Sequence, residues 1–257
     1  MEVTENTIGK LKVLIYASEQ ELGREAAKLV IDHIIALQKQ QDTVRMIFAS
    51  APSQSAFLND LKTDKRIDWN RITAFHMDEY IGLPADHSQS FGHYLRVHLF
   101  DHVSVGQVHY LDGIADEPAE ECKRYAGLLR EAPIDIVCMG IGENTHIVFN
   151  DPHVADFDDP ELVKIVDLDA ASRQQQVNDG CFPDLAAVPR FAMTLTVPAL
   201  LQGKSLYCMV PGERKADAIR ATLLEEISER VPSSILRRHR DARLFLDGQS
   251  ASKLNEL

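Results

Sequence analysis

The segment His76-Met77-Asp78-Glu79-Tyr80-Ile81-Gly82-Leu83-Pro84 places two carboxylates directly after an apolar run. That run, Ile72-Thr73-Ala74-Phe75, is typical of a buried strand. In an open α/β sheet, ligands bind in the crevice outside the carboxyl ends of the strands. We therefore expect an α/β fold in which Asp78 and Glu79 lie at a ligand-binding crevice.

A second polar segment follows another apolar run. Residues 134–139 read as a strand, and residues 140–152 (GIGENTHIVFNDP) form a glycine-containing turn with a histidine, His146. Because the carboxyl ends of parallel strands meet at one edge of a sheet, we expect both segments to contribute to a single site.

Short apolar runs alternate with amphipathic segments along the whole chain. This pattern predicts a mostly parallel sheet with helices on both faces. The expected strands are residues 11–16, 44–48, 72–75, 134–139, 193–197, 205–210 and 243–246. The expected helices are residues 19–38, 90–102 and 216–231. No repeat or linker interrupts the alternation, so we predict one domain over residues 1–257.

Composition limits the class of protein. The 257 residues are 45% hydrophobic, and the formal net charge is −12. This charge argues against a nucleic-acid partner, which requires a basic surface. No apolar run reaches the roughly 18 residues of a membrane span, and the polar, acidic N-terminus is unlike a secretory signal. We expect a cytoplasmic protein with no membrane partner.

Motifs for the common cofactors and metals are missing. The sequence contains no GxxxxGK[ST] phosphate loop and no GxSxG nucleophile elbow, and Thr145 stands where a dinucleotide fingerprint starting at Gly140 needs glycine. The four cysteines include no CxxC pair. We therefore predict no cofactor, no metal site and no disulfide framework.

Two segments suit a small phosphorylated ligand. Residues 50–55, which include Ser50, Ala51, Ser53 and Gln54, follow an expected strand and precede a helix. Their hydroxyls and backbone amides are suited to an anion, although serine is equally favoured in a plain helix cap. Lys215 follows the strand 205–210 and is placed to reach a phosphate across the sheet edge.

Together these segments resemble the glucosamine-6-phosphate deaminase/isomerase family, which is related to 6-phosphogluconolactonases. Residues 77–83 match the family segment (L/M)DEY(V/I)GL, and residues 140–152 are similar to GxGxxGHIAFN(E/D)P. Further similarity lies in residues 188–196, 212–215 and 233–239. The resemblance spans most of the chain. It implies the fold of ribose-5-phosphate isomerase and CoA transferases, a sugar-phosphate substrate, and a homo-oligomer.

The resemblance also implies residue roles. The enolisation base falls on Asp78, the ring-opening histidine on His146, and the acid after the FN dipeptide on Asp151. Asn144 precedes the histidine and is counted with these catalytic residues. The implied substrate-binding residues are Ser50, Ala51, Ser53, Gln54, Glu79, Gly142, Arg173 and Lys215.

The chemistry of an amino-sugar phosphate isomerase fits these residue types. A proton must leave carbon 2 and be delivered to carbon 1, which one carboxylate can do. Burial beside Phe75 and Met77 is expected to raise the pKa of Asp78. His146 would move a proton between the ring oxygen and the anomeric hydroxyl. The plain alternatives are a helix-capping aspartate and a core histidine.

Several positions depart from the family pattern. Asn144 stands where the deaminases usually have an aspartate, and an amide orients a histidine but does not stabilise imidazolium, so we expect weaker ring opening. Thr145 replaces a glycine, and Asp151 is one methylene shorter than the common glutamate. The loop 50–54 lacks the glycines of a TGG(S/T)P-like run.

Three functions remain open. The favoured one is deamination and isomerisation of glucosamine 6-phosphate, or a relative such as galactosamine 6-phosphate. The second is hydrolysis of 6-phosphogluconolactone, although residues 146–150 follow the deaminase form of the motif. The third is a non-catalytic sugar-phosphate sensor that has lost the proton relay.

Overall fold

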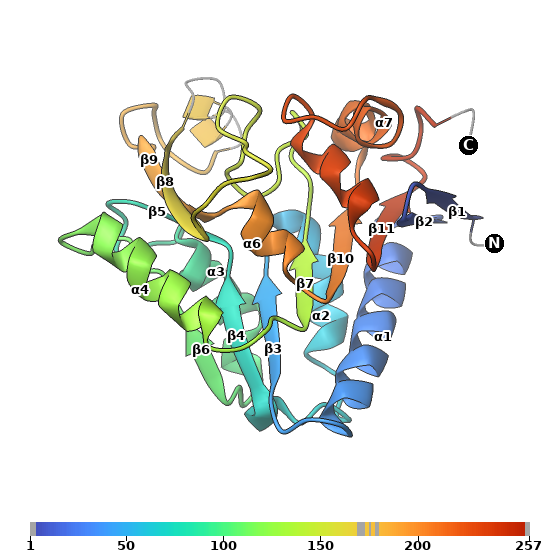
Figure 1. Cartoon of the computed structure of the whole chain (residues 1–257), viewed down its shortest axis with the longest axis horizontal. Coiled ribbons are helices and arrows are strands. Elements are labelled where there is room, and N and C mark those ends of the chain that lie inside the picture. The colour runs from blue at the N-terminus through green and yellow to red at the C-terminus, as the bar shows by residue number, and fades with distance from the viewer. Residues whose placement is uncertain (1–3, 169–172, 175, 178–179, 255–257) are drawn as a thin grey trace.

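A mostly parallel sheet forms the centre of the computed structural model, which describes residues 4–168, 173–174, 176–177 and 180–254 (Figure 1). Its eight strands have the order β1-β2-β11-β10-β7-β3-β4-β6, and every neighbouring pair is parallel except β1 with β2. The strands are Thr4–Ile8 (β1), Leu11–Tyr16 (β2), Val44–Phe48 (β3), Ile72–His76 (β4), Gln107–His109 (β6), Ile136–Met139 (β7), Ser205–Val210 (β10) and Ala242–Asp247 (β11).

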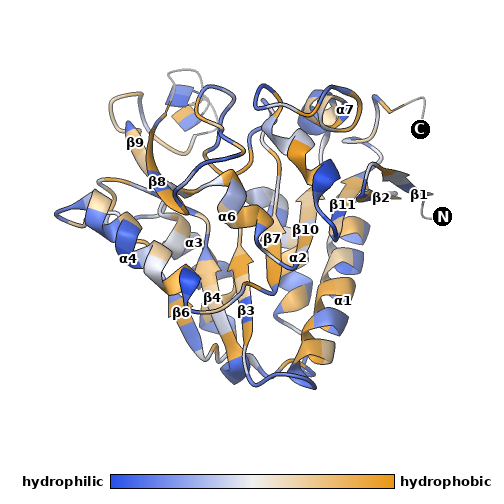
Figure 2. Cartoon of the chain, in the orientation of Figure 1, coloured by the Kyte–Doolittle hydropathy of each residue, from blue (hydrophilic) through white to orange (hydrophobic). Residues whose placement is uncertain are grey.

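Helices cover both faces of this sheet, as predicted. One face packs against α1 (Glu19–Gln38), α2 (Ser55–Leu61) and α3 (Phe91–His98). The other packs against α4 (Pro118–Arg130), α6 (Val197–Leu201) and α7 (Ala216–Leu224). Successive side chains of a strand point to opposite faces, so Phe48 belongs to the first core and Ile47 to the second. Figure 2 shows the resulting apolar interior of the sheet.

A second, smaller sheet lies beyond the carboxyl ends of the main strands (Figure 1). It is antiparallel, in the order β5-β9-β8, and consists of Asp78–Tyr80 (β5), Phe191–Leu195 (β9) and Val163–Asp167 (β8). The strand predicted at 193–197 therefore belongs to this sheet and ends earlier. Thr196 caps α6 by accepting a hydrogen bond from the Ala199 amide, which stops the strand at Leu195.

Other predicted boundaries were also wrong. The helix expected at 216–231 ends at Leu224, where Glu225 is extended and the Arg237 guanidinium donates to the Leu223 carbonyl. The helix expected at 90–102 ends at His98 and is followed by a short 3₁₀ turn. The 3₁₀ turns are Pro52–Gln54 (η1), Trp69–Arg71 (η2), Phe100–His102 (η3), Glu213–Lys215 (η4) and Pro232–Arg238 (η5). The prediction did not include β1, β5, β6, β8, α4 or α6, and it gave no bounds for the helix after residues 50–55, which is α2.

The strand order creates a switch point between β3 and β7. After β3 the chain continues to β4 and β6 on one side, whereas after β7 it continues to β10 and β11 on the other. Such a point is where open α/β sheets bind ligands. Consequently the loops that follow β3, β4, β7 and β10 converge there. In the part of the chain that the structure describes, no helix is both long and apolar enough to cross a membrane.

Candidate active site

A cavity of about 280 Å³ opens at the switch point. Its floor consists of residues that follow the four central strands: Ala49, Ser50, Ala51, Pro52, Ser53, Met77, Asp78, Gly140, Ile141, Gly142, Glu143, His146, Val148, Phe149, Asp151 and Lys215. Its walls add Tyr80, Phe91, Leu168, Arg173, Gln176 and Val188. The two segments that the sequence singled out therefore meet in one cavity.

Asp78 lies at the junction between the two sheets. It is the first residue of β5 and is half-buried, with its side chain lining the cavity. Burial, with a smaller effect of the Glu79 charge, raises the pKa of Asp78 well above its usual range. This direction agrees with the expectation from sequence. A carboxylate with a raised pKa is a better proton acceptor near neutral pH than an exposed one.

The strand end before Asp78 is firmly anchored. The hydroxyl of Tyr125, on α4, accepts a hydrogen bond from the His76 amide (3.0 Å) and lies 2.9 Å from the His76 carbonyl. The His76 imidazole accepts a hydrogen bond from the Leu111 amide through Nε2 (2.8 Å), and burial lowers its pKa to about 3. His76 is thus a neutral structural residue that helps to hold Asp78 in place.

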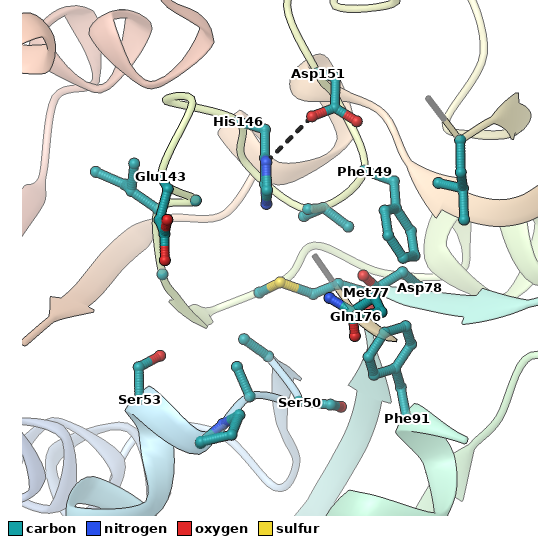
Figure 3. A pocket seen from close by; sticks show the side chains of 18 of the residues that line it. Ser50, Ser53, Met77, Asp78, Phe91, Glu143, His146, Phe149, Asp151 and Gln176 are labelled. Carbon is teal, nitrogen blue, oxygen red and sulfur yellow. Dashed lines mark ion pairs between the residues drawn. The ribbon is translucent and has the colours of Figure 1, made fainter. Parts of the chain in front are cut away.

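His146 points into the cavity from the loop that follows β7, and Asp151 lies behind it (Figure 3). Its Nδ1 lies 2.6 Å from Oδ1 of Asn144 and 3.2 Å from Oδ1 of Asp151. The Asn144 amide donates to the same Asp151 oxygen (2.7 Å). Asn144 itself is exposed and does not line the cavity. The three side chains form a compact cluster in which a carboxylate and an amide orient the imidazole.

His146 has a charged neighbour although position 144 is an amide. Asp151 is buried, with a 3% exposed side chain, and lies within ion-pair distance of the imidazole. Burial alone would raise the pKa of Asp151, but the hydrogen bonds and charge of His146 and the amide of Asn144 outweigh burial and lower it. Asp151 is therefore ionised at neutral pH and is able to stabilise an imidazolium.

The loop that presents His146 is tight and strained. A Cβ added at Gly142 would lie 2.1 to 2.4 Å from three atoms of the His146 ring, so only glycine fits there. Gly142 makes room for the histidine. Two β-branched residues beside it, Thr145 (φ 71°) and Val148 (φ 57°), adopt the left-handed conformation that such residues rarely occupy.

The opposite side of the cavity contains the expected anion-binding segments. Ser50, Ala51 and Ser53 line it, and the buried Ser50 hydroxyl has no hydrogen-bond partner among the described residues. Gln54 is buried below the surface of the cavity, where its amide donates to the Ser53 hydroxyl and the Met209 carbonyl, both at 3.2 Å. Gln54 thus links this loop, residues 50–54, to β10.

Two cationic side chains line the cavity. Lys215 ends η4, and the preceding turn at Gly212 (φ 96°) is anchored by a hydrogen bond from its amide to the Asp247 carboxylate (3.1 Å). Arg173 donates from Nη2 to the carbonyls of Leu185 and Val188, both at 2.7 Å. These cations supply positive charge to a cavity that also contains the carboxylates of Asp78, Glu143 and Asp151.

Comparison with known proteins identifies the family. A family model described as "Glucosamine-6-phosphate isomerases/6-phosphogluconolactonase" matches residues 17–245. The chain belongs to this family. Glucosamine-6-phosphate deaminases of Bacillus cereus (strain G9842) and Bacillus anthracis (strain A0248) are each 30% identical to it over 246 residues, which are 96% of this chain and 90% of each relative.

Solved structures of family members have the same fold. One described as a monomeric glucosamine-6-phosphate deaminase superposes with a TM-score of 0.86 at 29% identity, covering 94% of this chain and 99% of that one. A 6-phosphogluconolactonase from Thermotoga maritima superposes with a TM-score of 0.75 at 20% identity, covering 91% and 99%. The latter likeness concerns the fold alone. The predicted family and fold class are confirmed.

In this member of the family, the Glu79 side chain lies outside the cavity. Its side chain turns away from Asp78 and accepts hydrogen bonds at the N-terminus of α3. It is not among the described residues that line the cavity. The substrate-binding role that we expected for Glu79 therefore has no geometric support, because its carboxylate is buried against the helix.

An aromatic wall and one carboxylate were missed by sequence reasoning. Tyr80 and Phe91 stack with ring centroids 4.9 Å apart, and Phe149 lies 5.6 Å from Tyr80. Phe91 lies in the predicted helix 90–102, and an amphipathic pattern does not distinguish a core position from a cavity wall. Glu143 lines the cavity, and its carboxylate lies 3.4 Å from the Arg214 guanidinium. It belongs to the segment 140–152, so its place in that motif could have identified it as a site residue.

Proposed function

We propose that this protein deaminates and isomerises glucosamine 6-phosphate, or a close relative, to a ketose 6-phosphate and ammonium. One observation supports this proposal most. Asp78 and the His146–Asp151 pair face the same small cavity, which is also lined by Ser50, Ser53 and Lys215 (Figure 3). Identity of 30% to glucosamine-6-phosphate deaminases agrees with it.

In this proposal His146 opens the sugar ring. Its imidazole accepts the proton of the anomeric hydroxyl and returns a proton to the ring oxygen, giving the open-chain aldehyde. Asp151 stabilises the transient imidazolium, and Asn144 keeps the ring oriented. Both are needed because Nδ1 must remain the protonated nitrogen while Nε2 exchanges protons with the sugar.

Asp78 then moves one proton between two carbons. Its carboxylate removes the proton from carbon 2 while the aldehyde oxygen takes up a proton from the substrate's ammonium group, which gives an enolamine, and the carboxylate then delivers its proton to carbon 1. The product is an iminium at carbon 2. Water adds there and the amine leaves as ammonium, so the ketose phosphate is released. The apolar wall of Tyr80, Phe91 and Phe149 limits bulk water around the carboxylate during proton transfer.

The phosphate is assigned to the opposite side of the cavity. The Ser50 and Ser53 hydroxyls and the ammonium of Lys215 line this part, and Arg173 adds a second positive charge near the wall. Hydroxyl donors and an ammonium are suited to a phosphate dianion.

The test is ammonium release coupled to fructose 6-phosphate formation, at neutral pH, with an Asp78→Asn variant as the control. Turnover by the wild type that the variant loses supports the proposal. If the wild type is inactive, galactosamine 6-phosphate and 6-phosphogluconolactone are assayed next. Binding of sugar phosphates without turnover of any of them would replace the deaminase by a sensor.

The oligomeric state and the cellular location of the protein remain predictions. The resemblance implied a homo-oligomer, whereas one structural relative is described as monomeric. The cytoplasmic location rests on the sequence alone. Sedimentation velocity of the purified protein measures the first property directly.

A further inference from the structure

Helix α3 contacts the base side of the cavity through its N-terminus. The Glu79 carboxylate accepts hydrogen bonds from the Ser90 hydroxyl (2.7 Å) and from the amides of Phe91 (3.2 Å) and Gly92 (3.0 Å). It also accepts one from the Tyr80 amide, at 3.0 Å. An anion at a helix N-terminus satisfies donors that have no partner within the helix. The residue next to Asp78 is thus fastened to α3.

The same helix contacts the anion side one turn further on. The Tyr94 hydroxyl donates to the Ala51 carbonyl (2.8 Å) and lies 3.0 Å from the Ser55 hydroxyl. Ala51 lines the cavity and Ser55 begins α2. Tyr94 is therefore hydrogen-bonded to both ends of the loop that contains Ser53.

Between these two contacts α3 is packed closely. A Cβ at Gly92 would lie 3.0 Å from the Tyr110 ring and 3.5 Å from the Glu79 carboxylate. Phe91, in the same turn, lines the cavity, as does Asp78 (Figure 3). A close-packed helical turn with one polar contact at its start and another one turn further on behaves as a rigid spacer.

We propose that Glu79 and Tyr94 are positioning residues, and that through them α3 sets the separation between the Asp78 carboxylate and the loop of Ala51 and Ser53. This inference rests on the proposed function. In a hexosamine 6-phosphate, a fixed number of bonds joins the reacting carbon 2 to the phosphate. The base and the anion loop must match that separation, because small misplacements in an active site reduce the rate strongly.

The two residues should affect different kinetic constants. Tyr94→Phe removes only a hydroxyl on the anion side, so KM for glucosamine 6-phosphate and Kd for inorganic phosphate should each rise about 5-fold, the effect of one neutral hydrogen bond. Its kcat should stay within about 2-fold of the wild type. Glu79→Gln leaves the anion side intact, so kcat should fall about 10-fold with KM nearly unchanged.

A double-mutant cycle tests whether α3 couples the two sides. If it does, the effects of Glu79→Gln and Tyr94→Phe on kcat/KM should combine less than multiplicatively, by at least about 3-fold, because loss of either contact already stops α3 from setting the separation. The matched control is Tyr110→Phe, which removes a hydroxyl from a half-buried tyrosine against the same helix. It should change each constant by less than about 2-fold.

Several outcomes would overturn the inference. These are multiplicative effects in the double variant, an equal loss in Tyr110→Phe, or a Tyr94→Phe variant with unchanged phosphate affinity. The Kd for inorganic phosphate is measured by calorimetry and does not depend on whether the protein turns over a substrate. A wild type that binds phosphate but does not deaminate therefore refutes the proposed function, while a weaker Kd of Tyr94→Phe still supports its positioning role. A wild type that does not bind phosphate refutes the inference.

Discussion

The carboxylate of Asp151 lies 3.2 Å from Nδ1 of the His146 imidazole, and the Asn144 side chain bonds to both of them. Of the two carboxylates that the family pattern places around the histidine, the one two residues before it is an amide here, and the one five residues after it is retained as Asp151. The loop turns through Thr145 and Val148 in left-handed conformations, which brings Asp151 back to the ring. An amide at position 144 is compatible with acid-base catalysis because the charge is present at position 151.

The charge of Asp151 should matter more than the amide of Asn144. Asp151→Asn keeps the shape and removes the charge, and kcat should fall about 100-fold, within the range of acid-base catalysis. Asn144→Ala removes one orienting hydrogen bond and should lower kcat only about 5-fold. Steady-state kinetics at neutral pH measures both. Equal losses in the two variants would show that orientation, and not charge, is what His146 needs.

Ionisation of Asp78 should lower the free energy of unfolding as pH rises. Its pKa in the folded state is raised, so the fold favours the protonated form. Ionisation therefore destabilises the fold increasingly from the ordinary aspartate pKa of about 3.9 up to the raised one. Asp78→Asn does not ionise. Its unfolding free energy should equal that of the wild type below about pH 4 and exceed it increasingly at higher pH.

Urea denaturation of wild type and Asp78→Asn at a series of pH values measures this difference directly. At neutral pH the variant should be inactive and more stable, with Tm higher by roughly 2 °C or more, the shift that about 1 kcal/mol produces in a chain of this size. A wild type that gains stability over the variant as pH rises would contradict the raised pKa.

Gly142→Ala should inactivate the enzyme without unfolding it. The added Cβ would overlap the His146 ring, which must then move by about 1 Å, and a displacement of that size costs about 100-fold in kcat. The control is Gly127→Ala on the exposed face of α4, where a Cβ meets no atom within 4 Å. It should stabilise the protein by about 0.5–1 kcal/mol and leave kcat unchanged. Full activity of Gly142→Ala would disprove the position of the ring.

Thr145→Gly should stabilise the protein. The left-handed conformation costs threonine about 1–3 kcal/mol, and its buried hydroxyl has no hydrogen-bond partner among the described residues. Against this, glycine costs about 0.4–1 kcal/mol of backbone entropy and the lost methyl about 0.8 kcal/mol. The net gain should be about 1 kcal/mol. Thr145→Ala, which retains the strain, should unfold at a lower urea concentration than Thr145→Gly.

Deamination should persist after treatment with a chelator. The proposed steps are proton transfers by Asp78 and His146 and do not require a metal ion. Turnover before and after incubation with EDTA and gel filtration should agree within error. Loss of activity that added Mg²⁺ or Zn²⁺ restores would require a different mechanism.

Hydrophobic periodicity predicted the elements whose apolar pattern is long and regular. The strands Leu11–Tyr16, Val44–Phe48 and Ser205–Val210 and the helix Glu19–Gln38 occur at the predicted residues, because their apolar patterns are long and regular. The strand Phe191–Leu195 was placed in the wrong sheet. Its pattern shows that it is buried but not which strand it pairs with, since pairing is a contact between distant segments.

The sequence by itself determined the fold class, the family and the residues Asp78 and His146 at two strand ends. The tertiary structure decided which neighbouring side chain enters the cavity. Asp78 and Glu79 are adjacent carboxylates, but successive side chains of a strand point to opposite faces, and the pairing of β5 with β9 turns Asp78 to the cavity and Glu79 to α3. The contact of Asp151 with His146 likewise depends on a loop conformation that no local pattern encodes.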